Sequence, residues 1–391
     1  MSELPVYTNR SELISKITSG STAPEPGRPR TPVYRKIGAG CCGTVWAVDG
    51  KSYALKRHDG SIYRNLWNEY LIQSRVLETL NKAQSDGYAF DFLVPQCHFF
   101  ANPQQDASWF HKETTPSPSI SVPCDTMCVE RIHPLPATLV QTLVEKYSPA
   151  TALEDARHSC LARLYLGRRQ TEHQARRFSS HLNLPLTVNR VEDLHLDTLK
   201  YAMILADALA FMHWGAHVDA NDVEFVLGSP RRVAYSDHFL PYSEIGDLDP
   251  GSSTREMLAA DHNAPTTDPP NDEIQVWLLD FDCARVMTVD EAGVQQAVAA
   301  YFRNDPYYPR PQSATNQLSP DQALWDAFKC RYLRTSSRFI TKDGVEERLP
   351  DMFVVGVEKR ALGDGNPRET QRELDRAGAK VELRELGDGF P

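Results

Sequence analysis

A glycine-rich segment between two β-type stretches limits the fold of this chain more than any other part of its sequence. The segment GAGCCGTV matches G-x-G-x-x-G-x-V, with glycines at Gly38, Gly40 and Gly43 and a valine at Val45. Glycines at this spacing let the backbone approach phosphate groups, and the valine can cover the face of an adenine. A dinucleotide-binding fold would need a helix that opens directly at the third glycine. Residues 44–48 instead favour a strand, which argues against that alternative.

A lysine follows on the next predicted strand. Lys56 ends the run Ala-Leu-Lys, after an Asp49-Gly50 hairpin signal, and Glu69 lies 13 positions later within a helical pattern over 63–82. A lysine paired with a helix glutamate can hold its ammonium against the α- and β-phosphates of a nucleotide. The alternatives are a surface ion pair of little energetic weight, or Glu78 as the partner of the lysine.

Two further segments place carboxylates at the ends of short apolar strands. In the first, Asp219 precedes Glu224 by five positions, and an apolar strand over 223–227 follows. This spacing is typical of a catalytic loop whose aspartate orients or deprotonates an attacking hydroxyl. In the second, Asp280 ends the apolar run 275–280 and begins Asp-Phe-Asp. Its carboxylate is a hard oxygen ligand suited to Mg²⁺ beside a phosphate.

The order of the periodic segments predicts an α+β fold, β-rich first and helical second. Strands are predicted over 33–57, 90–100, 126–132, 223–227 and 275–280, and helices over 63–82, 137–147, 151–181, 197–213, 288–302 and 320–333. Residues 102–118 form a polar insertion. Residues 229–273 lack periodicity, which is typical of a lid, a docking element or disorder.

Charge and apolar patterning exclude several classes of protein. With 42 basic and 52 acidic residues the formal net charge is −10, which argues against non-specific binding to nucleic acid or acidic membranes. No run reaches the ~18 apolar residues that span a bilayer, and no secretory signal begins the chain. The 8 cysteines are scattered over the sequence. We therefore expect an intracellular protein, cytoplasmic or nuclear, without a membrane or nucleic-acid partner.

Two local clusters permit alternative interpretations. Cys124 and Cys128 with nearby His133 could belong to a zinc site, but no second pair follows at finger spacing, which favours ordinary buried thiols. Between Arg157 and Arg177 six arginines accompany a single acid, Glu172. This patch, expected on a helix, is either a solvated face or a docking site for an anionic substrate or acidic partner.

Taken together, these motifs resemble the protein-kinase-like superfamily, in the divergent branch that includes aminoglycoside and choline phosphotransferases. More narrowly, the segments 160–169, 219–228 and 277–282 resemble an uncharacterised fungal domain family often labelled zinc-finger-like. The resemblance covers residues 33–333. It implies a bilobal kinase-like fold with a β-rich N-lobe and a mostly helical C-lobe, and use of ATP with Mg²⁺ or Mn²⁺.

The extent of the resemblance, together with the composition of the two ends, divides the chain into four parts. A Pro-rich leader, expected to be disordered, covers 1–32, an N-lobe 33–135, a C-lobe 136–334 with the insert 229–273, and a charged extension 335–391. Within the extension, residues 353–357 suggest a strand, a helix is expected to open at Asn366, and Val381 to Leu386 suggest another strand.

The resemblance also assigns roles to residues. It gives the catalytic role to Asp219 and Asp280, and metal binding to Glu224 and Asp280. The nucleotide would contact Gly38, Gly40, Gly43, Val45, Lys56 and Glu69, and the hinge at Glu130. Because several carboxylates would surround one triphosphate, we expect ATP binding to require metal.

Departures from the kinase pattern leave two functions open. Glu224 stands where kinases have asparagine, Asp282 replaces the glycine of Asp-Phe-Gly, and no Ala-Pro-Glu element follows. One prediction is an ATP- and metal-dependent phosphotransferase acting on a hydroxyl of a small molecule or a protein. The alternative is a catalytically silent, pseudokinase-type scaffold or regulatory protein that binds partners.

Overall fold

The computed structural model shows an α+β structure with two five-stranded sheets. The structure describes residues 34–48, 50–113, 122–170, 183–232, 239–258, 273–304, 306–312, 320–340 and 345–362. The leader 1–32 and the elements predicted beyond residue 362 lie outside these described residues. Among the described helices, none has the length and apolar character needed to cross a membrane.

The first sheet contains the glycine-rich segment and is antiparallel throughout, in the order β1-β2-β3-β6-β5. Its strands are β1 (Tyr34–Ala39), β2 (Thr44–Val48), β3 (Tyr53–Arg57), β5 (Cys97–Ala101) and β6 (Thr126–Glu130). All of them were expected from the sequence, although β5 and β6 are shorter than predicted. Helix α2 (Leu66–Ser85) packs on β5 and β6, and its side chains Tyr70 and Val76 are fully buried.

The second sheet is mixed, in the order β4-β10-β9-β7-β8. Its strands are β4 (Phe92–Leu93), β7 (Leu161–Tyr165), β8 (Asn183–Thr187), β9 (Glu224–Gly228) and β10 (Gln275–Leu279). Strand β9 runs antiparallel to β10 and β7, whereas β10 pairs with β4 and β7 pairs with β8 in parallel. The strands predicted at 223–227 and 275–280 are confirmed as β9 and β10, and the structure shows that they are neighbours in one sheet.

The predicted long helix over 151–181 is wrong. Helix α5 ends after seven residues (Leu153–Ser159), and the chain then forms β7. Burial along β7 alternates with a period of two, with Ala162 and Leu164 inside, which is the pattern of a strand. The arginines between 157 and 169 are therefore spread over a helix, a strand and a turn, and Arg176 and Arg177 lie outside the described residues.

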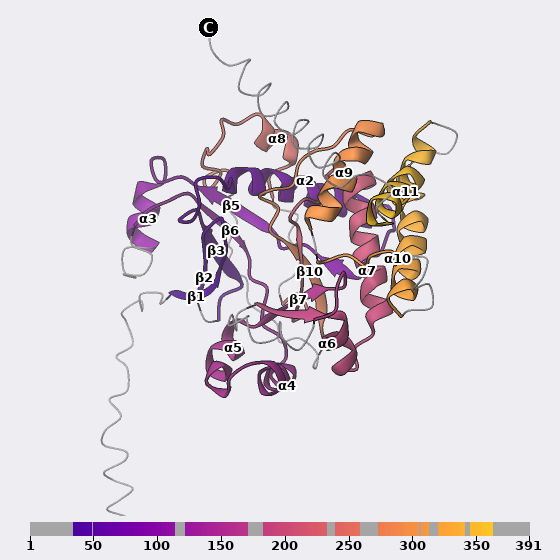
Figure 1. Cartoon of the computed structure of the whole chain (residues 1–391). Helices are drawn as coiled ribbons and strands as arrows, with labels where there is room; N and C mark the ends of the chain where they lie inside the picture. The colour runs from indigo at the N-terminus through magenta and orange to yellow at the C-terminus, as the bar shows by residue number, and fades with distance from the viewer. Residues whose placement is uncertain are drawn as a thin grey trace, which may run out of the picture.

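The remaining described helices are distributed around both sheets (Figure 1). The longer ones are α4 (Ala137–Tyr147), α7 (Thr198–Ala210), α9 (Glu291–Arg303), α10 (Pro320–Ser336) and α11 (Leu349–Leu362). The shorter ones are α3 (Ala107–Glu113), α6 (Val188–Asp193) and α8 (Tyr242–Gly246), with η2 (Ala150–Ala152) after α4, η4 (Phe211–Gly215) continuing α7, and η6 (Val345–Arg348) before α11. In Figure 1, α7, α9, α10 and α11 gather on one side and the first sheet lies on the other, with β7 and β10 between.

Residues 353–357 were expected to form a strand and instead lie in α11. Leu349, Phe353 and Val357 are spaced by four and are all buried, so they form one apolar face of a helix. That face packs on α9 and α10, where the Phe353 ring lies 4.9 Å from the Tyr332 ring. The run of β-branched residues suggested a strand, but burial on this face decides the structure.

The described parts of the insert 229–273 pack against the first sheet and α2. Thr254 donates its backbone N–H to the carbonyl of Phe100, 2.9 Å away, and its hydroxyl lies 2.9 Å from the Tyr70 hydroxyl. Helix α8 contacts α2, and the Tyr242 N–H donates to the carboxylate of Glu78 at 2.9 Å. Glu78 is thereby occupied by the insert and is not the partner of Lys56.

Candidate functional site

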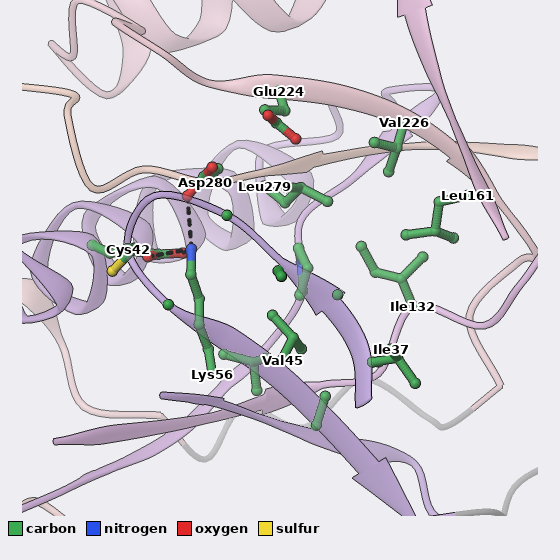
Figure 2. A pocket seen from close by; sticks show the side chains of 18 of the residues that line it. Ile37, Cys42, Val45, Lys56, Ile132, Leu161, Glu224, Val226, Leu279 and Asp280 are labelled. Atoms are coloured by element: carbon green, nitrogen blue, oxygen red, sulfur yellow. Dashed lines mark hydrogen bonds and ion pairs between the residues drawn. The ribbon is translucent and has the colours of Figure 1, made fainter. Parts of the chain in front are cut away.

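A cavity opens between the two sheets, and most of the predicted site residues line it. Its walls are apolar and include Ile37, Val45, Val226 and Leu279 (Figure 2). Figure 2 shows Lys56, Asp280 and Glu224 toward one end of the cavity, and Ile37, Ile132, Leu161 and Val226 toward the other. The cavity therefore combines a charged end with an apolar end.

The Lys56 ammonium joins two carboxylates at the charged end. Its Nζ atom lies 2.6 Å from Glu69 of α2 and 2.7 Å from Asp280 at the end of β10. The pair of Lys56 and Glu69 was predicted from spacing alone, and Asp280 joins them from 224 positions away. Asp280 has a φ of 68°, a left-handed conformation that costs energy for a non-glycine residue and is concentrated at functional sites.

One ammonium shared by two carboxylates shifts the pKa values of all three groups. Burial alone would lower the pKa of Lys56, but the charges of Asp280 and Glu69 raise it well above its usual range. Burial raises the pKa of Glu69 to about 7 despite the lysine. For Asp280, burial is outweighed by the charge and hydrogen bond of Lys56, which hold its pKa below the usual value. Lys56 therefore favours the ionised form of Asp280, whereas burial favours the neutral form of Glu69.

The glycine segment is fixed by contacts with residues 59–61. The Gly40 N–H donates to the Gly43 carbonyl at 2.8 Å, and Asp59 accepts from the backbone N–H and hydroxyl of Thr44. A Cβ atom at Gly43 would lie 1.9 Å from the Arg57 carbonyl oxygen, so no larger residue fits there. A Cβ atom at Gly40 would meet nothing within 4 Å. Gly40 is thus required, if at all, by a bound ligand rather than by the fold.

Glu224 lines the same cavity, but an arginine holds it. The Arg163 guanidinium of β7 lies 2.8 Å from the Glu224 carboxylate of β9. Both residues line the cavity. Burial raises the pKa of Glu224 to about 7, although the positive charge of Arg163 opposes the shift. The predicted metal ligand is therefore engaged by a cation that belongs to the chain itself.

Asp219 is not among the residues that line the cavity. It is 4% exposed, and its carboxylate accepts hydrogen bonds from the backbone N–H groups of Asn221 and Arg285 and from the Gln296 amide, at 2.9–3.0 Å. Burial raises the pKa of Asp219 above its usual value, and these donors oppose the shift. With three donors on one buried carboxylate, Asp219 holds its loop to the segment 285–296.

Glu130 also lines the cavity with its side chain engaged elsewhere. Its carboxylate is 2% exposed and accepts from the Arg231 guanidinium at 2.8 and 2.9 Å and from the Gln96 N–H at 3.1 Å. Because its side chain is committed to these bonds, any contact of Glu130 with a ligand would involve the backbone.

The predicted metal ligands do not fit a metal ion in this arrangement. Glu224 is held by Arg163 and Asp280 by Lys56, so each carboxylate already has a cationic partner. Among the described side chains, one group of three has suitable ligand atoms close together: Asp222, Asp282 and Cys283. The Arg64 guanidinium donates to all three at 2.6–3.1 Å.

Sequence reasoning missed the cations Arg64, Arg163 and Arg231. The signal for Arg163 was present, since Leu-Ala-Arg-Leu-Tyr alternates as a strand does, but the surrounding arginines made the segment resemble a solvated helix. The basic patch is in part accounted for by ion pairs, because Arg169 bonds Glu192 and Asp321 at 2.7–2.9 Å. No sequence spacing relates these arginines to their partners.

Comparison with known proteins gives one partial match. The family model DUF3669, described as "Zinc finger protein", matches residues 276–344, a stretch that contains most of β10, Asp280, α9 and α10. A search of curated proteins finds no match. All eight cysteines are free thiols, and the described residues hold no four-ligand set of cysteine and histidine of the zinc-finger type. Cys124 and Cys128 do not belong to the one group of potential ligands found there.

Proposed function

We propose that this chain has a bilobal kinase-like fold and binds ATP in the cleft between its two sheets. The first sheet with α2 would form one lobe, and the second sheet with its helices the other. The observation that carries the proposal is the Lys56 ammonium, which joins Glu69 and Asp280 at the charged end of an apolar cleft. A lysine held in this way is suited to phosphate oxygens.

The apolar end of the cleft is suited to the purine base of ATP, with the phosphates at the charged end. Val45 of β2 and Ala54 of β3 face the cavity from the first sheet, and Val226 and Leu279 face it from the second. A flat aromatic ring between such walls buries both of its faces. Bound ATP would supply a phosphoryl group, and the chain would supply Lys56 to orient its phosphates.

We further propose that binding occurs without phosphoryl transfer, which is the scaffold alternative raised by the sequence. The aspartate expected as catalytic base, Asp219, is buried with three donors on its carboxylate. Glu224 is held by Arg163. Neither carboxylate is available for catalysis in this arrangement.

A phosphotransferase acting on a hydroxyl group remains the second candidate. It is favoured by the position of Asp280, which lines the cavity, contacts Lys56 and has the left-handed φ of a residue held for a function. This candidate requires Asp219 or Glu224 to exchange its present partners for substrate.

Calorimetric titration of ATP into the wild-type protein and into Lys56→Met tests the proposal. We expect Lys56→Met to weaken ATP binding at least tenfold, because the phosphates lose the cation that faces them. Lys36→Met, which removes an exposed lysine of β1, should leave the affinity unchanged. Equal affinity of wild type and Lys56→Met, or no ATP binding by the wild type, would refute the proposal. ATP turnover by the wild type above that of Lys56→Met would favour the second candidate.

A further inference from the structure

At the charged end of the cleft, lysine and arginine side chains of the protein pair with the carboxylates. Glu224 is paired with Arg163 at 2.8 Å, Glu69 and Asp280 share Lys56, and Glu130 is paired with Arg231 at 2.8 Å. Just outside the cavity lining, Arg64 sits among Asp222, Asp282 and Cys283. At Glu224 and Asp280, the two predicted metal ligands, a guanidinium and an ammonium therefore lie where a kinase-like site would need a divalent ion.

A metal ion at these two carboxylates would have to bind beside the cations that already hold them. A divalent ion beside Glu224 would lie close to the positive charge of Arg163, and beside Asp280 it would compete with Lys56. Like charges in a partly desolvated cleft repel strongly. The resident arginine and lysine therefore oppose metal binding at the two residues that the sequence predicts as metal ligands.

A phosphate group has no such conflict with the same side chains. A guanidinium carries five N–H donors in a planar fork, so Arg163 can keep a carboxylate and donate to a phosphate oxygen at the same time. Arg163 and Lys56 act on the same region, since the charges of both lower the pKa of Asp280. Both side chains line the cavity, so a phosphate at this end of the cleft would be attracted by both cations.

Paired cations offset the remaining negative charge. The charged side chains that line the cavity are Lys56, Arg163, Glu69, Glu130, Glu224 and Asp280. Glu224 is paired with Arg163, Glu69 and Asp280 with Lys56, and Glu130 with Arg231. The repulsion between clustered carboxylates, which led us to expect a need for metal, is thereby weakened.

We propose that this cleft binds the phosphates of a nucleotide without a divalent metal ion, with Arg163 in place of the metal. The inference rests on the proposed ATP site and specifies how that site holds its ligand. Glu224 acts as a positioning residue that keeps the Arg163 guanidinium in the cavity. Lys56 supplies the second phosphate contact.

Titration of ATP in EDTA and in excess Mg²⁺ tests the inference on the full chain. We expect wild-type dissociation constants within about threefold of each other in the two conditions. Arg163→Met should weaken binding in EDTA at least tenfold, and Mg²⁺ should restore part of the loss because Glu224 is released. Arg163→Lys, which keeps a cation, should retain more of the metal-free affinity. Lys36→Met is the matched control on an exposed lysine.

Each outcome separates this inference from the proposal on which it rests. Wild-type binding that is at least tenfold weaker in EDTA than in Mg²⁺ would overturn the metal-free mode while leaving the ATP site intact. Equal metal-free affinity of wild type and a folded Arg163→Met would overturn the role of Arg163. No ATP binding in either buffer would refute the ATP site and the inference together. The wild-type comparison needs no variant, so a substitution that fails to fold does not prevent the test.

Discussion

The segment around Lys56 and the loop 217–224 both carry a motif with kinase-like spacing, but their side chains meet very different partners. Lys56 contacts Glu69, as its spacing predicts, and faces the cavity. In the loop, Asp219 accepts three hydrogen bonds away from the cavity, and Glu224 is paired with Arg163. The same kind of sequence evidence thus describes a cavity-lining group in one region and, in the other, a buried group that does not line the cavity.

The difference lies in where the partners come from. Lys56 and Glu69 belong to consecutive elements, β3 and α2, so the spacing between them controls their contact. The partners of the loop come from Arg163 on β7 and Gln296 on α9, whose positions depend on the order of the second sheet and on helix packing. A motif therefore indicates which residues are close in the chain, and the tertiary partners decide their role.

The largest expected effect tests whether Asp219 holds the fold. Asp219→Ala removes the acceptor of two backbone N–H groups and the Gln296 amide, and buried donors without acceptors cost about 1–3 kcal/mol each. We expect the free energy of unfolding to fall by about 4 kcal/mol in urea titrations followed by tryptophan fluorescence.

Asp222→Ala is the matched control in the same loop. Its side chain is 41% exposed and bonds Arg64, which also contacts Asp282, so we expect a loss of less than about 1 kcal/mol. If Asp219→Ala lowers the free energy of unfolding no more than Asp222→Ala does, Asp219 does not stabilise the fold. The contrast between the loop and the Lys56 region would then be lost.

A second prediction separates two glycines of the motif. Gly43→Ala places a Cβ atom against the Arg57 carbonyl, and we expect a loss of about 3 kcal/mol in the free energy of unfolding. Gly40→Ala should change it by less than about 0.5 kcal/mol, because a Cβ atom there meets nothing within 4 Å.

The same pair of variants also reports on the ligand. If the segment lies over phosphates, Gly40→Ala should weaken ATP binding while the protein keeps its stability, as measured by thermal denaturation and calorimetry. Unchanged affinity for Gly40→Ala would show that the glycine spacing serves the hairpin and not the nucleotide. The glycine motif near Lys56 would then have a structural role, as we infer for Asp219 in the loop 217–224.

The sequence was sufficient for the strands of the first sheet, though not for their order in the sheet, and for the order of most elements along the chain. Alternating strands and a hairpin signal leave few ways to form β1, β2 and β3, and α2 begins at the cap residue Asn65, which accepts from the Asn68 N–H. Errors arose where composition and period disagreed. The arginine-rich segment around β7 resembled a helix, and the run of β-branched residues in α11 resembled a strand.

The charged partners of the site residues could not be predicted from the sequence, for a different reason. The pair Arg163 and Glu224 exists because β7 and β9 are neighbours in a mixed sheet, a topology that no single segment specifies. Arg64 lies among Asp222, Asp282 and Cys283 because the turn before α2 meets the segments after β10 and before β9. Such contacts depend on tertiary topology, which a list of motifs does not contain.

The smallest expected effect compares the two regions through their proton uptake. Burial raises the pKa of Glu69, in the Lys56 region, and of Glu224, in the loop, from 4.5 to about 7. The folded state therefore binds more protons than the unfolded state between these pH values, and the free energy of unfolding falls as pH rises through this window. Glu69→Gln and Glu224→Gln should each flatten this fall by about 2 kcal/mol between pH 5 and 7.

Urea titrations at several pH values measure this slope for the wild type, the two single variants and the double variant. We expect the double variant to have the flattest profile, because both groups that gain protons on folding are gone. If only Glu224→Gln flattens the dependence of stability on pH, Glu69 remains ionised beside Lys56. The Lys56 ammonium would then be paired with two ionised carboxylates, those of Glu69 and Asp280. That outcome would sharpen the contrast between the regions, since Glu69 would then keep its negative charge at neutral pH while Glu224 would not.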